Sequence, residues 1–125
     1  MIGDIPPMTV REIARILEAE VLSGEELLDT TNVVSACGAD MMSEVLAFSK
    51  GNSVLLTGLT NQQTVRTAEM MDILCLTYVR GKRPDAAVIE LARSTGILIL
   101  ATRFNMYHAC GLLFQAGLPS GDMKE

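Results

Sequence analysis

The sequence predicts an α/β fold of three layers, α/β/α, in which a largely parallel sheet built from βα units lies between helices. The main observation is a pattern that occurs three times in the second half of the chain. An apolar run of strand length ends at a small polar loop, and an amphipathic stretch follows; the runs are Ser53–Thr57, Ile73–Val79 and Ile97–Thr102. The runs begin 20 and then 24 residues apart, a spacing typical of βα units.

The length and composition support this fold class and indicate one domain over residues 1–125. A chain of 125 residues is of ordinary single-domain size. Apolar residues make up 49% of it, whereas aromatic residues make up only 4%, so the core must be aliphatic. The eight methionines fill gaps in that core or form an adaptable interaction surface. In the pairs Met41-Met42 and Met70-Met71, at most one side chain can face the core, which leaves the other for a subunit interface.

The first elements are a helix and a short strand. Residues 1–8 form a lead-in. Thr9 and Glu12 have the spacing of a capping box, so a helix is expected from there to about Glu18. Val21-Leu22 is expected to form a short strand before the next turn.

The middle of the chain begins with a strand at Asn32–Ala36. A helix over 41–49 follows, for which Asp40 is the expected N-cap and Gly51 the expected left-handed residue after the end. The next strand is Ser53–Thr57. Thr60 or Asn61 then caps a helix that runs to about Met71.

The last part of the chain contains the strand expected at the centre of the sheet, Ile73–Val79, because it is the most apolar. Pro84 suits the first turn of a helix that runs to about Thr95. After the strand Ile97–Ala101, a final helix is expected over 105–116, capped by Asn105. The tail from Ser120, residues 120–125, is expected to fray.

Net charge and cysteine usage exclude several classes of protein. A net charge of −5 argues against general nucleic-acid binding and against attraction to anionic membranes. No apolar run approaches the ~20 residues that span a bilayer, and the N-terminus has no signal-peptide pattern. Cys37, Cys75 and Cys110 are odd in number and widely spaced, which favours a reducing, cytoplasmic location.

No motif for catalysis or for a cofactor occurs. The sequence lacks the phosphate-binding G-x-x-x-x-G-K-[ST] loop, the dinucleotide-binding G-x-G-x-x-G pattern and the G-x-S-x-G nucleophile turn. It also lacks H-E-x-x-H and any Cys/His group with zinc spacing. We therefore expect a protein that is not an enzyme and that holds no cofactor or metal.

Two residues could still carry chemistry. Cys37 lies in a predicted loop before a helix, a position that can activate a thiol, although no basic neighbour is visible in the sequence. His108 is the only histidine, and either a general-base or a structural role is open to it. Cys110 is two positions from His108, about 200° around a helix, so the two side chains should not share a site.

The loops after the apolar strands are the candidate ligand site, because ligands bind at the carboxyl ends of the strands in open α/β sheets. The loop Arg80–Pro84 is the best candidate, since it combines a flexible glycine, cationic side chains and a helix N-terminus. A solvated turn and ordinary helix caps are the alternative explanation. The candidate ligand-binding residues are Thr57, Gly58, Thr60, Asn61, Arg80, Gly81, Lys82, Arg83, Thr102 and Arg103.

Six strings, in this order and spacing, resemble the DRTGG domain family. They are Met8–Ile13, Glu20–Glu26, Leu55–Thr60, Val79–Pro84, Ile89–Ala92 and Gly96–Leu100. The resemblance spans nearly the whole chain and implies a stand-alone member. It implies an α/β/α domain similar to the N-terminal domain of HPr kinase/phosphorylase, with a regulatory role. Family members accompany CBS domains in regulated pyrophosphatases or sit within phosphotransacetylases, and small relatives are encoded near iron-only hydrogenases in anaerobes.

The chain departs from the family at the letters that name it. Where the family has Thr-Gly-Gly before a helix headed by proline, this chain has Val79-Arg80-Gly81. Where the family has Asp-Arg, it has Leu59-Thr60 or nearby polar residues. Gly81 and Pro84 carry over, so the backbone turn is expected to survive, with Arg80 as a replacement cation.

These observations lead to two functional hypotheses. The first is a non-enzymatic regulatory or interaction module, a homodimer, linked to a protein partner in a hydrogenase or another anaerobic redox or metabolic system. The alternative is a domain that senses a nucleotide or another small anionic, phosphorylated metabolite at the βα loops. Neither hypothesis involves nucleic acid or a membrane.

Overall fold

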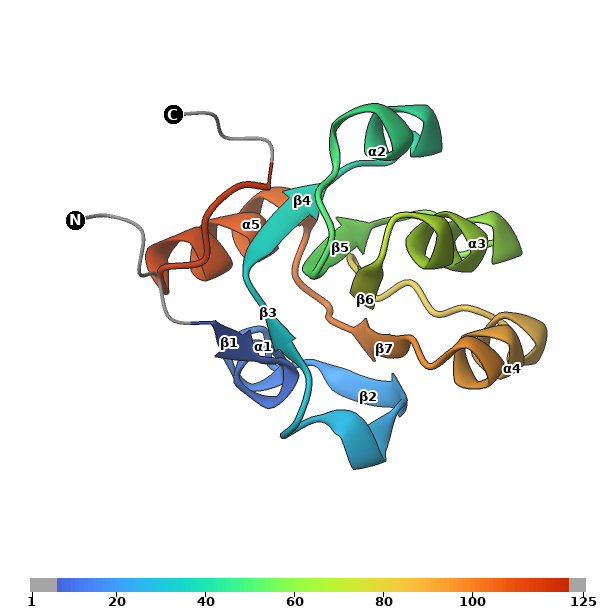
Figure 1. Cartoon of the computed structure of the whole chain (residues 1–125). Helices are drawn as coiled ribbons and strands as arrows, with labels where there is room; N and C mark the ends of the chain where they lie inside the picture. Colours follow the sequence, from blue (N-terminus) through green and yellow to red (C-terminus); the bar gives the residue numbers. More distant parts are fainter. Residues whose placement is uncertain (1–6, 122–125) are drawn as a thin grey trace.

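A five-stranded sheet forms the centre of the computed structural model, which describes residues 7–121 (Figure 1). The strands are β1 (Met8–Thr9), β2 (Glu20–Ser23), β3 (Asn32–Val33), β4 (Ser35–Gly38), β5 (Ser53–Thr57), β6 (Ile73–Tyr78) and β7 (Leu98–Ala101). The helices are α1 (Val10–Ile16), α2 (Met42–Phe48), α3 (Gln62–Met70), α4 (Ala86–Thr95) and α5 (Met106–Gln115), with a 3-10 turn at Glu25–Leu27.

The sheet has the order β2-β7-β6-β5-β4, and its last four strands are parallel. The prediction that Ile73–Val79 is central is confirmed, because β6 is the third of the five strands. β2 is the short strand expected at Val21-Leu22, and it lies antiparallel to β7. β1 and β3 form a separate antiparallel pair.

Helices cover both faces of the sheet, as the predicted three-layer fold requires. Figure 1 shows α2, α3 and α4 on one face and α1 and α5 on the other. Every residue of β5 is buried, as expected for a parallel strand covered on both sides. The core therefore has two halves. Side chains such as Val45, Val65 and Val88 fill one, and Ile13 and Leu113 belong to the other.

Side-chain caps begin four of the helices. Thr9 and Glu12 form the predicted capping box of α1. Asn61 caps α3, Asp85 caps α4 and Asn105 caps α5, each by accepting a bond from the backbone N–H three residues later. These bonds satisfy N–H groups that lack a partner in the first turn of a helix.

The prediction of one continuous strand over Asn32–Ala36 was wrong. The segment forms two strands, β3 and β4, because the first pairs with β1 and the second with β5. Val34 joins them, and its side chain is 47% exposed. The chain thus leaves the small sheet and enters the large one within a single residue.

Three predicted helix boundaries were also wrong. Met41, not Asp40, is the N-cap of α2, and it makes no side-chain cap. The left-handed residue after α2 is Asn52, with φ of 58°, and not Gly51. Pro84 lies before α4 and not in its first turn, because Asp85 is the cap.

The C-terminal segment is bonded to the edge of the sheet up to Gly121. The N–H of Ala36 donates to the carbonyl of Pro119 over 2.9 Å, and the N–H of Gly121 donates to the carbonyl of Ala36 over 3.1 Å. Ser120 forms an isolated parallel bridge with Ala36. Ser120 and Gly121, the first residues of the tail expected to fray, thus lie along β4 in this structure, and the other residues of that tail, 122–125, lie outside the described residues.

Candidate functional site

The carboxyl edge of the sheet brings four loops together, those that follow β4, β5, β6 and β7. Backbone hydrogen bonds connect three of them. The N–H of Val79 donates to the carbonyl of Thr57 over 3.1 Å, and the N–H of Arg80 donates to that of Phe104 over 2.8 Å. Gly81 donates to Thr102 over 2.9 Å. The three loops chosen from the sequence are thus neighbours in space.

Arg80 is the most distinctive residue at this edge. Its backbone is left-handed, with φ of 60°, a conformation that costs a residue with a side chain about 1 kcal/mol or more. The side chain is exposed, and within residues 7–121 its guanidinium forms neither a hydrogen bond nor an ion pair. A Cβ added to Gly58 would lie only 2.8 Å from its Nη2, so the guanidinium lies across the loop after β5.

Asp40 holds that same loop. Its Oδ1 accepts a hydrogen bond of 2.7 Å from the N–H of Gly58 and one of 3.2 Å from the hydroxyl of Thr57. Sequence reasoning assigned Asp40 to a helix cap, because Asp before an apolar run is the usual capping signal. Its real partners are 17 and 18 residues away, and no local pattern reveals such contacts.

The two candidate threonines at strand ends are structural. Thr57 and Thr102 are 0% and 1% exposed. The hydroxyl of Thr57 donates to Asp40 and accepts from the N–H of Leu59. That of Thr102 donates to the carbonyl of Leu17 over 2.7 Å. Both hydroxyls already have partners, so neither is available to a ligand in this conformation.

Two of the candidate arginines are paired with glutamates. Arg83 forms an ion pair with Glu20, and Arg103 forms one with Glu18 over 3.2 Å. The hydrogen bond from Arg83 lowers the pKa of the Glu20 carboxyl, which therefore stays charged at neutral pH. These four side chains and Gly81 line a small pocket of about 250 Å³, together with Ala101 and Thr102. Its charges are balanced, so it does not favour an anion.

The remaining candidates have separate positions. Asn61 uses its side-chain oxygen to cap α3. Thr60 is half-buried, and Lys82 is exposed. Gly81 has φ of 70°, so it supplies a left-handed turn that favours glycine. Among the predicted site residues, the exposed side chains of Arg80 and Lys82 stay open to a ligand, and Arg80 lies against Gly58 in the fold.

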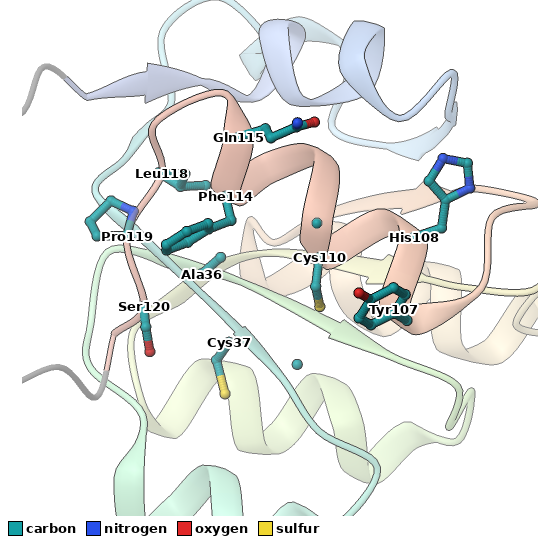
Figure 2. Close-up of a pocket in the computed structure, with 12 residues that line it drawn as sticks. Ala36, Cys37, Tyr107, His108, Cys110, Phe114, Gln115, Leu118, Pro119 and Ser120 are labelled. Carbon is teal, nitrogen blue, oxygen red and sulfur yellow. The ribbon is translucent and has the colours of Figure 1, made fainter.

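A larger pocket lies away from these loops, between β4 and α5 (Figure 2). Its volume is about 710 Å³, within the range of ordinary ligand pockets. The lining residues are Ala36, Cys37, Gly38, Tyr107, His108, Cys110, Gly111, Phe114, Gln115, Leu118, Pro119 and Ser120. Sequence reasoning missed this pocket, although a signal was available: α5 carries no charged residue.

The cysteines and the histidine do not form a catalytic group. Cys75 lies in the core, where it is 0% exposed, and this burial raises the pKa of its thiol to about 12. Cys110 is only half-buried, and burial raises the pKa of its thiol too. The His108 ring lies 4.3 Å from that of Phe104, and Figure 2 shows it directed away from Cys37 and Cys110.

The described residues contain no group of three or more His, Cys, Asp or Glu side chains that could hold a metal ion. Within the same residues, no helix is long and apolar enough to cross a membrane.

Comparison with known families gives a match over most of the chain. The model of the DRTGG domain matches residues 12–116. The chain belongs to the DRTGG domain family. DRTGG is a regulatory domain, which agrees with the expectation that this chain is not an enzyme. The search of curated proteins gave no match.

A solved structure that contains a DRTGG domain has the same fold. It holds the CBS and DRTGG domains of the regulatory region of a pyrophosphatase from Clostridium perfringens, in complex with its activator, diadenosine tetraphosphate. The TM-score is 0.72 at 19% identity, over 94% of this chain. The chain spans half the length of that neighbour. The likeness confirms the predicted three-layer α/β fold with a mostly parallel sheet.

Proposed function

We propose that this chain is a regulatory DRTGG domain that senses a small phosphorylated metabolite at the carboxyl edge of its sheet. The observation that carries the proposal is Arg80: an exposed guanidinium without an ion-pair partner in residues 7–121, on a left-handed backbone, at the edge where α/β sheets bind ligands. An arginine fork binds phosphate through two parallel hydrogen bonds.

The surroundings of Arg80 hold it ready for such a contact. Its own N–H is bonded to the carbonyl of Phe104, which holds the backbone in place. Gly58 leaves room for the guanidinium because it has no Cβ, and Asp40 holds Gly58 in position. Strained backbone that the surrounding structure enforces is frequent at ligand-binding sites.

The chemical class of the first probe comes from the structural neighbour. That structure contains CBS and DRTGG domains in complex with the activator diadenosine tetraphosphate, and this chain covers half of its length. A nucleotide with several phosphates is therefore the first compound to test, and inorganic phosphate is the second.

The test compares Arg80→Gly with a matched control. Glycine adopts a left-handed φ without strain, so the variant removes the guanidinium and keeps the turn. Arg66→Gln removes an exposed arginine from α3, away from the edge. We expect calorimetric titration with diadenosine tetraphosphate to show at least about tenfold weaker binding for Arg80→Gly, because a charged hydrogen-bonding pair contributes about 1.5–3 kcal/mol. Arg66→Gln should bind as the unchanged chain does.

Equal affinity of the unchanged chain and Arg80→Gly for this nucleotide would contradict the role of Arg80. No binding of either the nucleotide or inorganic phosphate would contradict the sensing function. Because a ligand stabilises the native state by RT ln(1 + [L]/Kd), a thermal-shift series on the same samples gives an independent check.

We also propose that the domain forms a homodimer, as its methionine pairs suggest. One methionine of each pair packs inward and the other is exposed: Met41 is 57% and Met70 69% exposed, whereas Met42 is buried and Met71 partly buried. Light scattering distinguishes particles of 13.5 kDa from particles of twice that mass. The link to a hydrogenase or another redox partner rests on the family resemblance alone and stays a prediction.

A further inference from the structure

The helix α5 carries an exposed apolar stripe. Tyr107, Cys110, Gly111 and Phe114 lie at positions i, i+3, i+4 and i+7, which share one face of a helix. The side chain of Tyr107 is 89% exposed and that of Phe114 69%. Figure 2 shows the two rings along the pocket, with Cys110 between them. Large rings at both ends and small residues in the middle give this stripe a pattern that reads the same in both directions.

Gly111 lies in the middle of this stripe, and no contact or backbone conformation within its own chain requires a glycine there. Glycine within a helix costs about 0.5–1 kcal/mol relative to alanine. Its backbone is helical, and a Cβ added to it would meet nothing within 4 Å. The missing side chain therefore leaves open space on the outside of the helix, where a close neighbour from another molecule would lie.

No Asp, Glu, Lys or Arg side chain on α5 opposes contact with a second copy of the same chain. The chain has a net charge of −5 and 20% charged residues, yet α5 has no Asp, Glu, Lys or Arg. Two copies can therefore meet here without placing like charges against each other. The polar side chains of His108 and Gln115 flank the stripe, which matches an apolar centre with a polar rim.

We propose that α5 is the homodimer interface, with two copies of the helix crossing antiparallel at Gly111 about a twofold axis. In this arrangement Tyr107 of each copy packs against Phe114 of the other, because a twofold contact pairs each residue with its counterpart in reverse order. Gly111 lets the two helix backbones approach closely at the crossing. The inference rests on the homodimer proposed above, but it places the interface on α5 and not at Met41 and Met70, which lie on the other face of the sheet. It does not depend on Arg80.

The test replaces one ring of the stripe with a charge. Phe114→Lys places two like charges in the proposed interface, and Ala87→Lys is the control, since Ala87 is exposed on α4, on the other face of the sheet. Light scattering over a range of concentrations should give a dissociation constant at least about tenfold higher for Phe114→Lys, as for a central interface residue, and an unchanged one for Ala87→Lys. Both positions are exposed, so both variants should melt near the temperature of the unchanged chain.

Gly111→Leu tests the crossing itself. A side chain at this position meets nothing within 4 Å at its Cβ inside the chain, so the variant should fold, whereas the added side chain should hold the two helices apart and raise the dissociation constant at least about tenfold. Ala87→Leu, on the exposed side of α4, should leave the dissociation constant unchanged.

Particles of 13.5 kDa at every concentration would overturn both the interface and the homodimer. A dimer that Phe114→Lys leaves intact would overturn this interface alone. A monomer whose Gly38 amide signal shifts with added adenosine would assign the pocket to a small molecule, which also overturns the interface. The effect of Arg80→Gly on nucleotide binding does not depend on the dimer. The sensing function and the α5 interface can therefore be contradicted independently of each other.

Discussion

Gly58 and Gly24 both lie where an added Cβ would collide with a neighbour, but the neighbours differ. At Gly58 the contact is the far end of the exposed Arg80 side chain, at 2.8 Å. At Gly24 it is the buried Leu98, at 2.7 Å, and φ is 86°. Arg80 can move aside and Leu98 cannot, so the same substitution has different consequences at the two positions.

We therefore expect Gly58→Ala to change the free energy of unfolding by less than about 1 kcal/mol and to weaken nucleotide binding by displacing Arg80. Gly24→Ala should cost about 2 kcal/mol or more, from left-handed strain and overpacking together. Urea unfolding measures the first quantity and calorimetric titration the second. A Gly58→Ala variant with full affinity would show that the position of Arg80 does not matter.

The three cysteines should differ in reactivity. Burial raises the pKa of Cys75 to about 12, so at neutral pH it stays a thiol, and the thiolate is the reactive form. We expect iodoacetamide to modify Cys75 only as fast as the protein unfolds, whereas the partly exposed Cys37 and Cys110 react from the native state. Peptide mapping by mass spectrometry at increasing urea concentrations would measure the rate of modification at each cysteine. Modification of Cys75 at the rate of Cys37 in the native protein would contradict the burial.

At the scale of elements, local signals determine helix starts where their partners are also local. The bond from the N–H of His108 to Asn105 is 2.8 Å long and spans three residues, so the sequence pattern identifies it. The carboxylate of Asp40 shows the limit, because its partners belong to the next strand. The pattern of residues around Asp40 is that of a cap, and tertiary contacts override it.

Asn105→Ala should therefore weaken α5 and lower the free energy of unfolding by about 1 kcal/mol, a shift of a few degrees in Tm for a domain of this size. Asn105→Ser should restore most of this loss, because serine is also a good N-cap. Thermal unfolding followed by circular dichroism measures both. Because α5 forms the proposed dimer interface, the measurements need equal protein concentrations. Equal stability of the alanine variant would mean that the cap bond contributes nothing.

At the scale of the whole molecule, the layers and most of the parallel sheet could be predicted, because runs such as Ser53–Thr57 have an apolar pattern that reflects burial on both faces. The place of β2 at the edge, antiparallel to β7, could not, since no residue pattern specifies strand direction. The candidate site was predictable to the level of its loops. Which side chains remain available to a ligand depends on distant partners. Glu18 pairs with Arg103, 85 residues away, and Glu20 pairs with Arg83, 63 residues away.

Glu20 pairs with Arg83 and so connects the N-terminal third of the molecule to the rest, whereas Arg11 and Asp29 pair within that third. Both ion pairs should make the stability of the molecule depend on pH. The hydrogen bond from Arg83 lowers the pKa of Glu20 below its ordinary value of 4.5, and the one from Arg11 lowers the pKa of Asp29 below 3.8. The native state therefore binds fewer protons than the unfolded state in this range. The stabilisation is present above about pH 4.5 and is lost as the pH falls through the lower, folded values.

The double variant Glu20→Gln/Asp29→Asn removes both titrations. We expect it to be less stable than the unchanged chain at neutral pH, and the difference to narrow as the pH falls below about 4. Added salt should also reduce the difference, because all four side chains are largely exposed. Urea unfolding from neutral to acid pH measures this, with Glu90→Gln on the exposed side of α4 as the control. A difference that stays constant down to about pH 3 would mean that uncharged hydrogen bonds, not ion pairs, stabilise these two contacts.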